Sequence, residues 1–246
     1  VRLLIMQAIM VIIMVMVMVE GVGATQEEAM KSAMNDGGTH DIGMNMQHIA
    51  IAIVTSSAVS DTRLPLLYDA WVHDAIERGV TVMAISDIMD PCIGDNSNQR
   101  YDDGTHHNPA CKHSINTAYC VHNGIPCEPS KDGIPCKTGC VYTTLWQHPD
   151  RQKVTWYVRV MDDTMVVLDA LVRQLSAIDH TTPQYVGAMV KLQGLPPEFP
   201  LPRDAHFAWG GAGWALSRAA VEMAVGHIGT YHDLIHTLRR GLPFPN

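Results

Sequence analysis

The sequence predicts a mixed α/β domain. Two observations favour this class: short apolar runs typical of buried strands recur along the chain, and amphipathic helical segments alternate with them. The size is the third observation, because 246 residues with 47% hydrophobic content can bury a sizeable core. We interpret residues 49–246 as one large domain with a mixed, mainly parallel sheet.

An apolar segment precedes this domain. Leu3 to Val19 would reach roughly 25 Å as a helix, a little less than the roughly 30 Å hydrocarbon core of a bilayer. Val22 and Ala24 have the small-residue spacing of a signal-peptidase site. Residues 1–24 are therefore predicted to be a signal anchor or a cleaved signal peptide, and residues 25–48 a stem. Both alternatives send the chain into the secretory pathway.

The first elements of the domain have the order strand, helix, strand. Ile49 to Val54 is an apolar run that ends in a polar loop, which predicts a buried strand. Thr62 to Arg78 places apolar residues at helical spacing, and Gly79 follows as a typical C-terminal cap. Val80 to Ile85 lacks polar alternation, so a strand covered on both faces is expected.

Residues 89–140 are predicted to be a cysteine-rich insertion. They are rich in Gly, Pro, Asn and Asp, and no long helix or strand is expected there. An even number of cysteines in an oxidising compartment favours disulfides, and zinc is the competing interpretation. No two cysteines have the two-residue spacing of a zinc knuckle. The six are Cys92, Cys111, Cys120, Cys127, Cys136 and Cys140.

Regular structure is expected again after the insertion. Val154 to Val160 predicts a strand, Thr164 to Ile178 a helix, and Tyr185 to Val190 a further strand. Residues 194–203 form a proline-rich loop in this interpretation. Trp214 to Val225 is expected to be a helix that follows a glycine-rich turn.

Two carboxylates at the end of the strand at 154–160 are the main candidates for chemistry. Asp162 and Asp163 would hold a divalent cation against a diphosphate, because hard oxygen ligands suit Mg²⁺ or Mn²⁺. Adjacent acids also cap helices, so this pair alone is not specific. The second feature is the turn at Trp209, Gly210 and Gly211, where backbone can approach a ligand closely and an aromatic face can stack on a sugar.

Charge and composition argue against nucleic acid as a partner. The formal net charge is −8, and no basic patch with interleaved aromatic residues is present.

The chain resembles the Fringe-like glycosyltransferases, including the related T-synthase-type β-1,3-galactosyltransferases. Trp156-Tyr-Val-Arg-Val-Met-Asp-Asp-Thr-Met-Val166 is similar to the family's strand of type W-F-x-x-x-D-D-D-x-Y-V, and Gly210 to Arg218 is similar to its glycine-rich turn. Thr62 to Trp71, Ser86-Asp87 and Tyr185-Val-Gly187 give supporting matches.

The resemblance implies a GT-A-type fold and a hexosyltransferase. It would move a hexose or N-acetylhexosamine from a UDP-sugar to a hydroxyl of a glycoprotein glycan, with inversion. The expected cofactor is Mn²⁺ or Mg²⁺, and the expected location is the Golgi or endoplasmic reticulum membrane with a luminal domain, or outside the cell if the leader is cleaved. Asp163 takes the metal-binding place. The residues expected at the donor are Thr55, Arg63, Asp87, Asp162, Trp209, Gly210 and Gly211.

Two departures leave alternatives open. Met161 stands where the family has a first acid. Both ends are interpreted as cut, because the chain begins with Val1 and stops at Asn246 without a closing helix or strand. The motif that carries the catalytic base would follow Asn246, so this chain is expected to be nearly inactive. General-base help is typically worth about 10² to 10⁴ in rate. A secreted cysteine-rich sugar-binding module or inactive relative of the same fold is one alternative. A metal-dependent hydrolase that uses Asp162, Asp163 and histidines of the insertion such as His106 and His107 is another.

Overall fold

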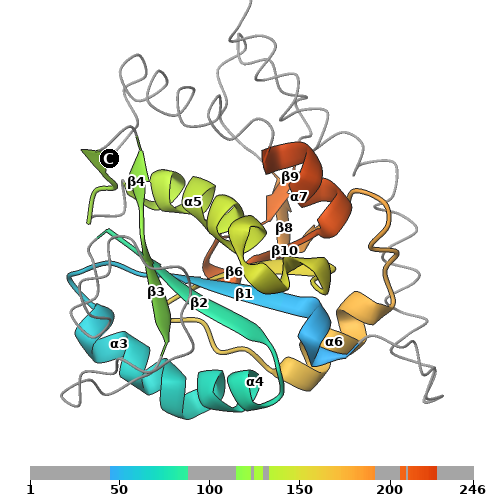
Figure 1. The fold of residues 1–246 in the computed structure, drawn as a ribbon, viewed down its shortest axis with the longest axis horizontal. Coiled ribbons are helices and arrows are strands. Elements are labelled where there is room, and N and C mark those ends of the chain that lie inside the picture. The colour runs from blue at the N-terminus through green and yellow to red at the C-terminus, as the bar shows by residue number, and fades with distance from the viewer. Residues whose placement is uncertain are drawn as a thin grey trace, which may run out of the picture.

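The computed structural model describes residues 45–87, 115–122, 125–129, 133–191, 206–208 and 210–225. Within them, a six-stranded sheet lies between two layers of helices (Figure 1). The strand order is β3-β2-β1-β6-β10-β7; the first four strands are parallel, and β10 is antiparallel to both of its neighbours. The strands are β1 (Ile49–Val54), β2 (Thr81–Ser86), β3 (Asn116–Tyr119), β6 (Trp156–Met161), β7 (Tyr185–Gly187) and β10 (Trp214–Ser217). This arrangement confirms the predicted α/β class and fits a GT-A-type fold.

The predicted strand, helix and strand at the start of the domain are all present. β1 is buried at every position because helices cover both faces of the sheet. The helical segment runs through α3 (Ser60–Leu67), a π-helical turn (Tyr68–Val72) and α4 (His73–Glu77). It ends at Gly79, whose φ of +85° is a conformation that favours glycine.

Alternate residues of β1 enter two separate cores. Ile49, Ile51 and Ile53 belong to the core under α3, α4 and α6 (Leu168–Ser176). The smaller Ala50 and Ala52 belong to the core under α5 (Ile134–Gln147) and α7 (Arg218–Val225). In Figure 1 these two groups of helices lie below and above the sheet. The alternation follows from the two-residue side-chain period of a strand.

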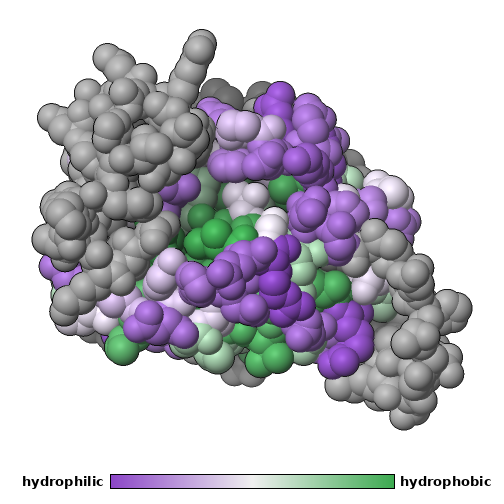
Figure 2. Space-filling model, turned by 60° about the horizontal axis from the view of Figure 1, so that its bottom comes forward, coloured by the Kyte–Doolittle hydropathy of each residue, from purple (hydrophilic) through white to green (hydrophobic). Residues whose placement is uncertain are grey.

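The described residues on the face shown in Figure 2 are largely hydrophilic, with smaller hydrophobic areas. Figure 2 shows one such area in a hollow between hydrophilic edges. The large apolar side chains that stay exposed within the described residues are Leu66, Ile76, Met165, Val167 and Met189. No helix in the described ranges has the length and apolar character needed to cross a bilayer. Residues 1–44, where the signal or anchor and most of the stem are predicted, lie outside those ranges.

Three later elements differ from the sequence prediction. Residues 214–217 were predicted to open a helix but form β10, and α7 begins only at Arg218. The predicted helix from Thr164 begins at Leu168. The predicted single strand 185–190 is divided: β7 joins the main sheet, whereas β8 (Met189–Lys191) pairs with β9 (His206–Ala208) in a separate two-stranded sheet. The predicted loop at 194–203 lies outside the described residues.

The expectation of no long helix or strand in residues 89–140 was wrong. β3 lies in this segment and is a strand of the main sheet, and α5 begins there at Ile134. A short hairpin of β4 (Val121–His122) and β5 (Ile125–Pro126) separates them. Short 3₁₀ helices flank the larger elements at Met46–His48, Pro149–Gln152 and Gly210–Ala212.

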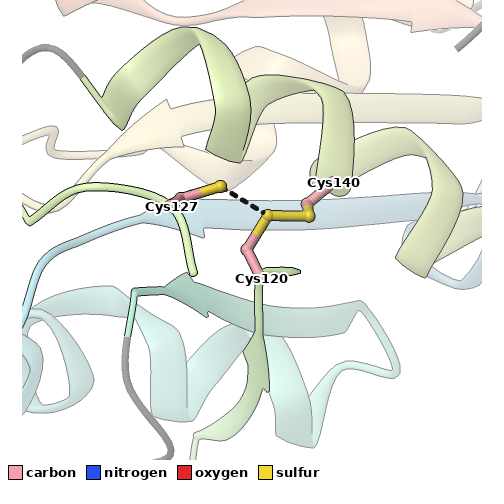
Figure 3. A group of neighbouring side chains, drawn as sticks. All are labelled: Cys120, Cys127 and Cys140. Carbon is pink, nitrogen blue, oxygen red and sulfur yellow. Dashed lines mark hydrogen bonds between the residues drawn. A yellow bond between two sulfur atoms is a disulfide. The ribbon is translucent and has the colours of Figure 1, made fainter. Parts of the chain in front are cut away.

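The predicted disulfides are present. Cys120 is bonded to Cys140, and Cys127 to Cys136. The two bridges touch: the sulfur of Cys127 lies 3.0 Å from that of Cys120 (dashed line in Figure 3). This contact explains why three cysteine sulfurs gather in one place. Because all four are oxidised, no thiolate of the group is left to bind zinc. Cys92 and Cys111 lie outside the described residues.

Candidate active site

The carboxyl ends of three neighbouring parallel strands bring the predicted polar residues together. Thr55 follows β1, Asp87 follows β2, and Asp162 follows β6. β1 lies between the other two strands in the sheet, so its loop can reach both neighbours. All three residues are buried, at 3%, 4% and 4% exposure respectively. Open α/β sheets commonly bind ligands at this edge.

Asp162 is held from two sides. Its Oδ2 accepts a hydrogen bond from Oγ1 of Thr55 at 2.8 Å, and its Oδ1 accepts one from Nη1 of Arg63 at 2.6 Å. Arg63 comes from the first turn of α3, and 43% of its side chain is exposed. The sequence predicted neither contact. It predicted only that Thr55, Arg63 and Asp162 each contact the donor sugar nucleotide. Asp162 is therefore a fixed carboxylate with a cation beside it.

Asp163 has the opposite environment. Its side chain is 64% exposed, and the nearest cationic atom is Nη1 of Arg63 at 3.8 Å. A hard divalent cation accepts one or two carboxylates together with substrate phosphates. An exposed carboxylate beside a fixed one fits that donor set. Among the residues the structure describes, no cluster of three carboxylates or imidazoles forms around Asp163.

Asp87 is satisfied within the protein. Its Oδ1 lies 2.6 Å from Nζ of Lys137, and its Oδ2 accepts a hydrogen bond from Oγ of Ser57 at 2.7 Å. Burial acts to raise the pKa of the Asp87 carboxyl, but the hydrogen bonds from Lys137 and Ser57 outweigh it, so the pKa lies below its ordinary value. Asp87 is a buried anion that holds protein groups in place.

Lys137 was missed by the sequence interpretation. It was assigned to an irregular insertion, whereas it lies in the first half of α5 with 1% exposure. A signal was available: Val141 and Leu145 repeat at helical spacing just beyond it. Gly139 and the threonines lower the helix propensity of the segment, which obscured that period.

The glycine turn lies beside the acidic loop. Thr164 connects the two, because its Oγ1 accepts from the Met161 amide at 3.2 Å and donates to the Gly211 carbonyl at 3.1 Å. Arg159, on β6, donates to the Gly210 carbonyl at 2.7 Å. The structure therefore brings the glycine turn close to the loop that carries the two acids. Trp209, predicted to contact donor or acceptor, lies outside the described residues.

Arg159 is a second residue that sequence reasoning missed. It is buried inside a strand that reads as apolar, with 1% exposure. Its guanidinium lies 4.4 Å from the centre of the Trp214 ring, a cation–π contact. The indole Nε1 of Trp214 donates to the hydroxyl of Tyr142 on α5. These contacts join β6, β10 and α5 behind the glycine turn.

Two other predicted features can be placed only in part. Met161 ends β6 and is partly buried against the α5 core, so the position of the family's first acid is occupied by an apolar side chain. His106 and His107, on which a metal-dependent hydrolase would depend, lie outside the described residues.

A family comparison agrees with this geometry. The family model described as Fringe-like matches residues 44–240, which is most of the chain and includes the strand ends, the acids and the glycine turn. A search of curated proteins gave no match. The resemblance in sequence rests on the segment with the acidic pair after β6 and on the glycine turn, and the mainly parallel sheet fits the fold that it implies. The chain therefore belongs to the Fringe-like family, a family of glycosyltransferases.

Proposed function

We propose that this protein transfers a hexose or an N-acetylhexosamine from a UDP-sugar to a hydroxyl of a glycoprotein glycan, with inversion at the anomeric carbon. The observation that carries the proposal is the asymmetry of the acidic pair: Asp162 is buried and fixed by two hydrogen bonds, whereas Asp163 is exposed beside it. The site would work in the Golgi or endoplasmic reticulum lumen, where disulfides such as those of α5 form.

The charge of the site suits a cation and a diphosphate together. Two cationic groups, Arg63 and Lys137, face three acids, Asp87, Asp162 and Asp163, which leaves one formal negative charge. That charge is on the exposed Asp163. Mn²⁺ or Mg²⁺ bound there would offset the charge that develops on the departing diphosphate.

Each residue of the site has a separate task in this proposal. Asp163 holds the cation, and Asp162 keeps Arg63 turned toward the edge of the sheet, where its half-exposed guanidinium can meet a phosphate oxygen. The turn at Gly210 and Gly211, held by Arg159 and Thr164, places backbone near the sugar. In the reaction the acceptor oxygen bonds to the anomeric carbon as the bond from that carbon to the diphosphate breaks. The acceptor proton leaves to a base, and UDP departs.

The proposal is tested by calorimetric titration of UDP into the purified protein, with and without Mn²⁺. We expect binding that requires the ion and is lost in Asp163→Asn, because the amide oxygen is a weaker ligand for a hard cation. Asp179→Asn is the matched control. Asp179 is an exposed aspartate in the connection between α6 and β7, away from the carboxyl ends of the strands. Its replacement should leave UDP binding unchanged.

The outcomes separate the candidate functions. Ion-dependent binding that disappears only in the Asp163 variant supports the transferase, and donor sugars are then compared by affinity. Binding of UDP-sugars without turnover by a version of the protein that carries the motif with the catalytic base, even with acceptor present, would favour the sugar-binding relative, for which the apolar Met161 is the supporting observation. A folded protein that binds no UDP in the presence of Mn²⁺ refutes the proposal.

A further inference from the structure

Lys137 is a buried lysine at the edge of the sheet where the acids gather. Its Nζ lies 2.6 Å from Oδ1 of Asp87 and 3.0 Å from the carbonyl oxygen of Thr55. Both side chains of the ion pair are only 2% exposed. A buried charge is costly unless it is paired and hydrogen-bonded, and this ammonium has both kinds of partner.

The pair holds the loop after β1 from two sides. Lys137 binds the carbonyl of Thr55, and Asp87 accepts from the hydroxyl and the amide of Ser57, two residues further on. The hydroxyl of Thr55 in turn donates to Asp162. A continuous set of hydrogen bonds therefore runs from Lys137 through one residue to the acidic pair.

The two disulfides fix the helix that carries Lys137. Cys136 and Cys140 lie on either side of it in the first half of α5, and each is bonded to the segment that follows β3. The amide of Cys120 donates to the carbonyl of Ser86, the residue before Asp87, at 2.9 Å. The same short stretch of chain thus holds both partners: the disulfides attach the helix of Lys137 to it, and a backbone hydrogen bond attaches the residue before Asp87.

Stability alone does not require charges at this place. Replacing a buried ion pair by apolar residues of similar volume is often neutral or stabilising. An apolar side chain at 137 could fill the space but could not bind the Thr55 carbonyl, and at 87 it could not hold Ser57. What the charged pair provides is a fixed loop.

We propose that Lys137 is a positioning residue for the donor site, which acts through Asp87 and the Thr55 carbonyl to hold the loop that orients Asp162 and leaves Asp163 available. This rests on the proposed function, because the site it positions is the one proposed to bind a nucleoside diphosphate and a divalent cation. Lys137 does not touch the substrate. Removal of both charges of the pair should weaken binding while the fold remains.

The experiment compares the wild-type protein with Lys137→Met, Lys137→Arg and the double variant Lys137→Met/Asp87→Leu. The double variant removes both charges, so it leaves no unpaired ion even if the single Met variant fails to fold. Thermal unfolding and calorimetric titration of UDP with Mn²⁺ are measured on each. Lys153→Met is the matched control, because it removes a lysine from an exposed ion pair with Asp150 before β6, at the other edge of the sheet.

We expect the double variant to unfold near the wild-type temperature and to bind UDP about 10- to 100-fold more weakly, the usual effect of losing a group that supports a ligand-binding residue. Lys137→Arg should retain more affinity than Lys137→Met, and the control should match the wild type. A stable double variant whose affinity is within about twofold of the wild type overturns the role of Lys137 while the transferase proposal stands. A wild-type protein that binds no UDP overturns both.

Discussion

Replacing Thr55 by valine tests whether Asp162 is held as the structure shows. Valine keeps the shape of threonine and removes only the hydroxyl that donates to Oδ2 of Asp162 at 2.8 Å. A hydrogen bond to a charged group is worth about 1.5–3 kcal/mol. Because Arg63 still contacts Oδ1 at 2.6 Å, the carboxylate keeps one partner, and the cost should stay within that range. For a domain of this size the Tm should fall by roughly 3–12 °C.

The assay is urea unfolding, supported by a thermal scan, with Thr181→Val as control. Thr181 makes a hydrogen bond of the same kind to Asp179 at 2.6 Å, but both residues are exposed. Water can replace the lost hydroxyl there, so the control should lose clearly less stability than Thr55→Val. Equal losses at Thr55 and Thr181 would refute the reasoning, because burial would then make no difference. UDP binding by Thr55→Val should be weakened as well.

Two further predictions concern the glycine turn and the buried ion pair. Gly213 has a φ of +78°, and an added Cβ would lie 2.7 Å from the carbonyl oxygen of Arg159. Gly213→Ala should therefore lower the free energy of unfolding in urea by at least about 1–2 kcal/mol. At Gly210 the nearest atom to an added Cβ is 3.5 Å away, so Gly210→Ala should change that free energy by less than about 0.5 kcal/mol. Because the pKa of Asp87 is lower in the folded protein than its ordinary value of 3.8, the stability it contributes is fully present above that value and is lost as the pH falls through the lower folded one. Asp87→Asn should lower the free energy of unfolding by about 3–5 kcal/mol at pH 7, because it leaves Lys137 without a charged partner. The difference in this free energy between variant and wild type should shrink in unfolding curves measured near pH 3. A difference that stays constant would contradict the lowered pKa of Asp87.

Elements with a strong local signal were predicted from the sequence. β1 consists of apolar residues alone, Val82 to Ile85 form an apolar run within β2, and Gly79 ends the intervening helix, so local composition sufficed. Residues 214–217 misled because Trp-Ala-Leu-Ser has no strand preference of its own. They become a strand because they lie between β6 and β7, with backbone partners on both sides.

In the candidate site, too, only the residues with a local sequence signal were predicted. The acids and the glycines are visible as motifs, and the structure brings them together through Thr164. Lys137 and Arg159 are not visible, because their roles depend on partners 50 and 51 residues away in sequence. The role of each residue becomes apparent only in the folded protein, where a buried carboxylate lies beside the lysine and a backbone carbonyl beside the arginine. Local patterns carry no information about such partners.

The position of β10 beside β6 has a consequence for how the chain is made. β6 leaves the ribosome well before residues 214–217, yet β10 is the strand that pairs with its second edge. Until then the N–H and C=O groups along that edge of β6 have no strand partner. Almost all side chains of β6 are buried in the folded protein. Unpaired strand edges promote association between chains. The nascent protein therefore passes through an interval in which β6 is an edge strand, and the interval ends when residues 214–217 pair with it.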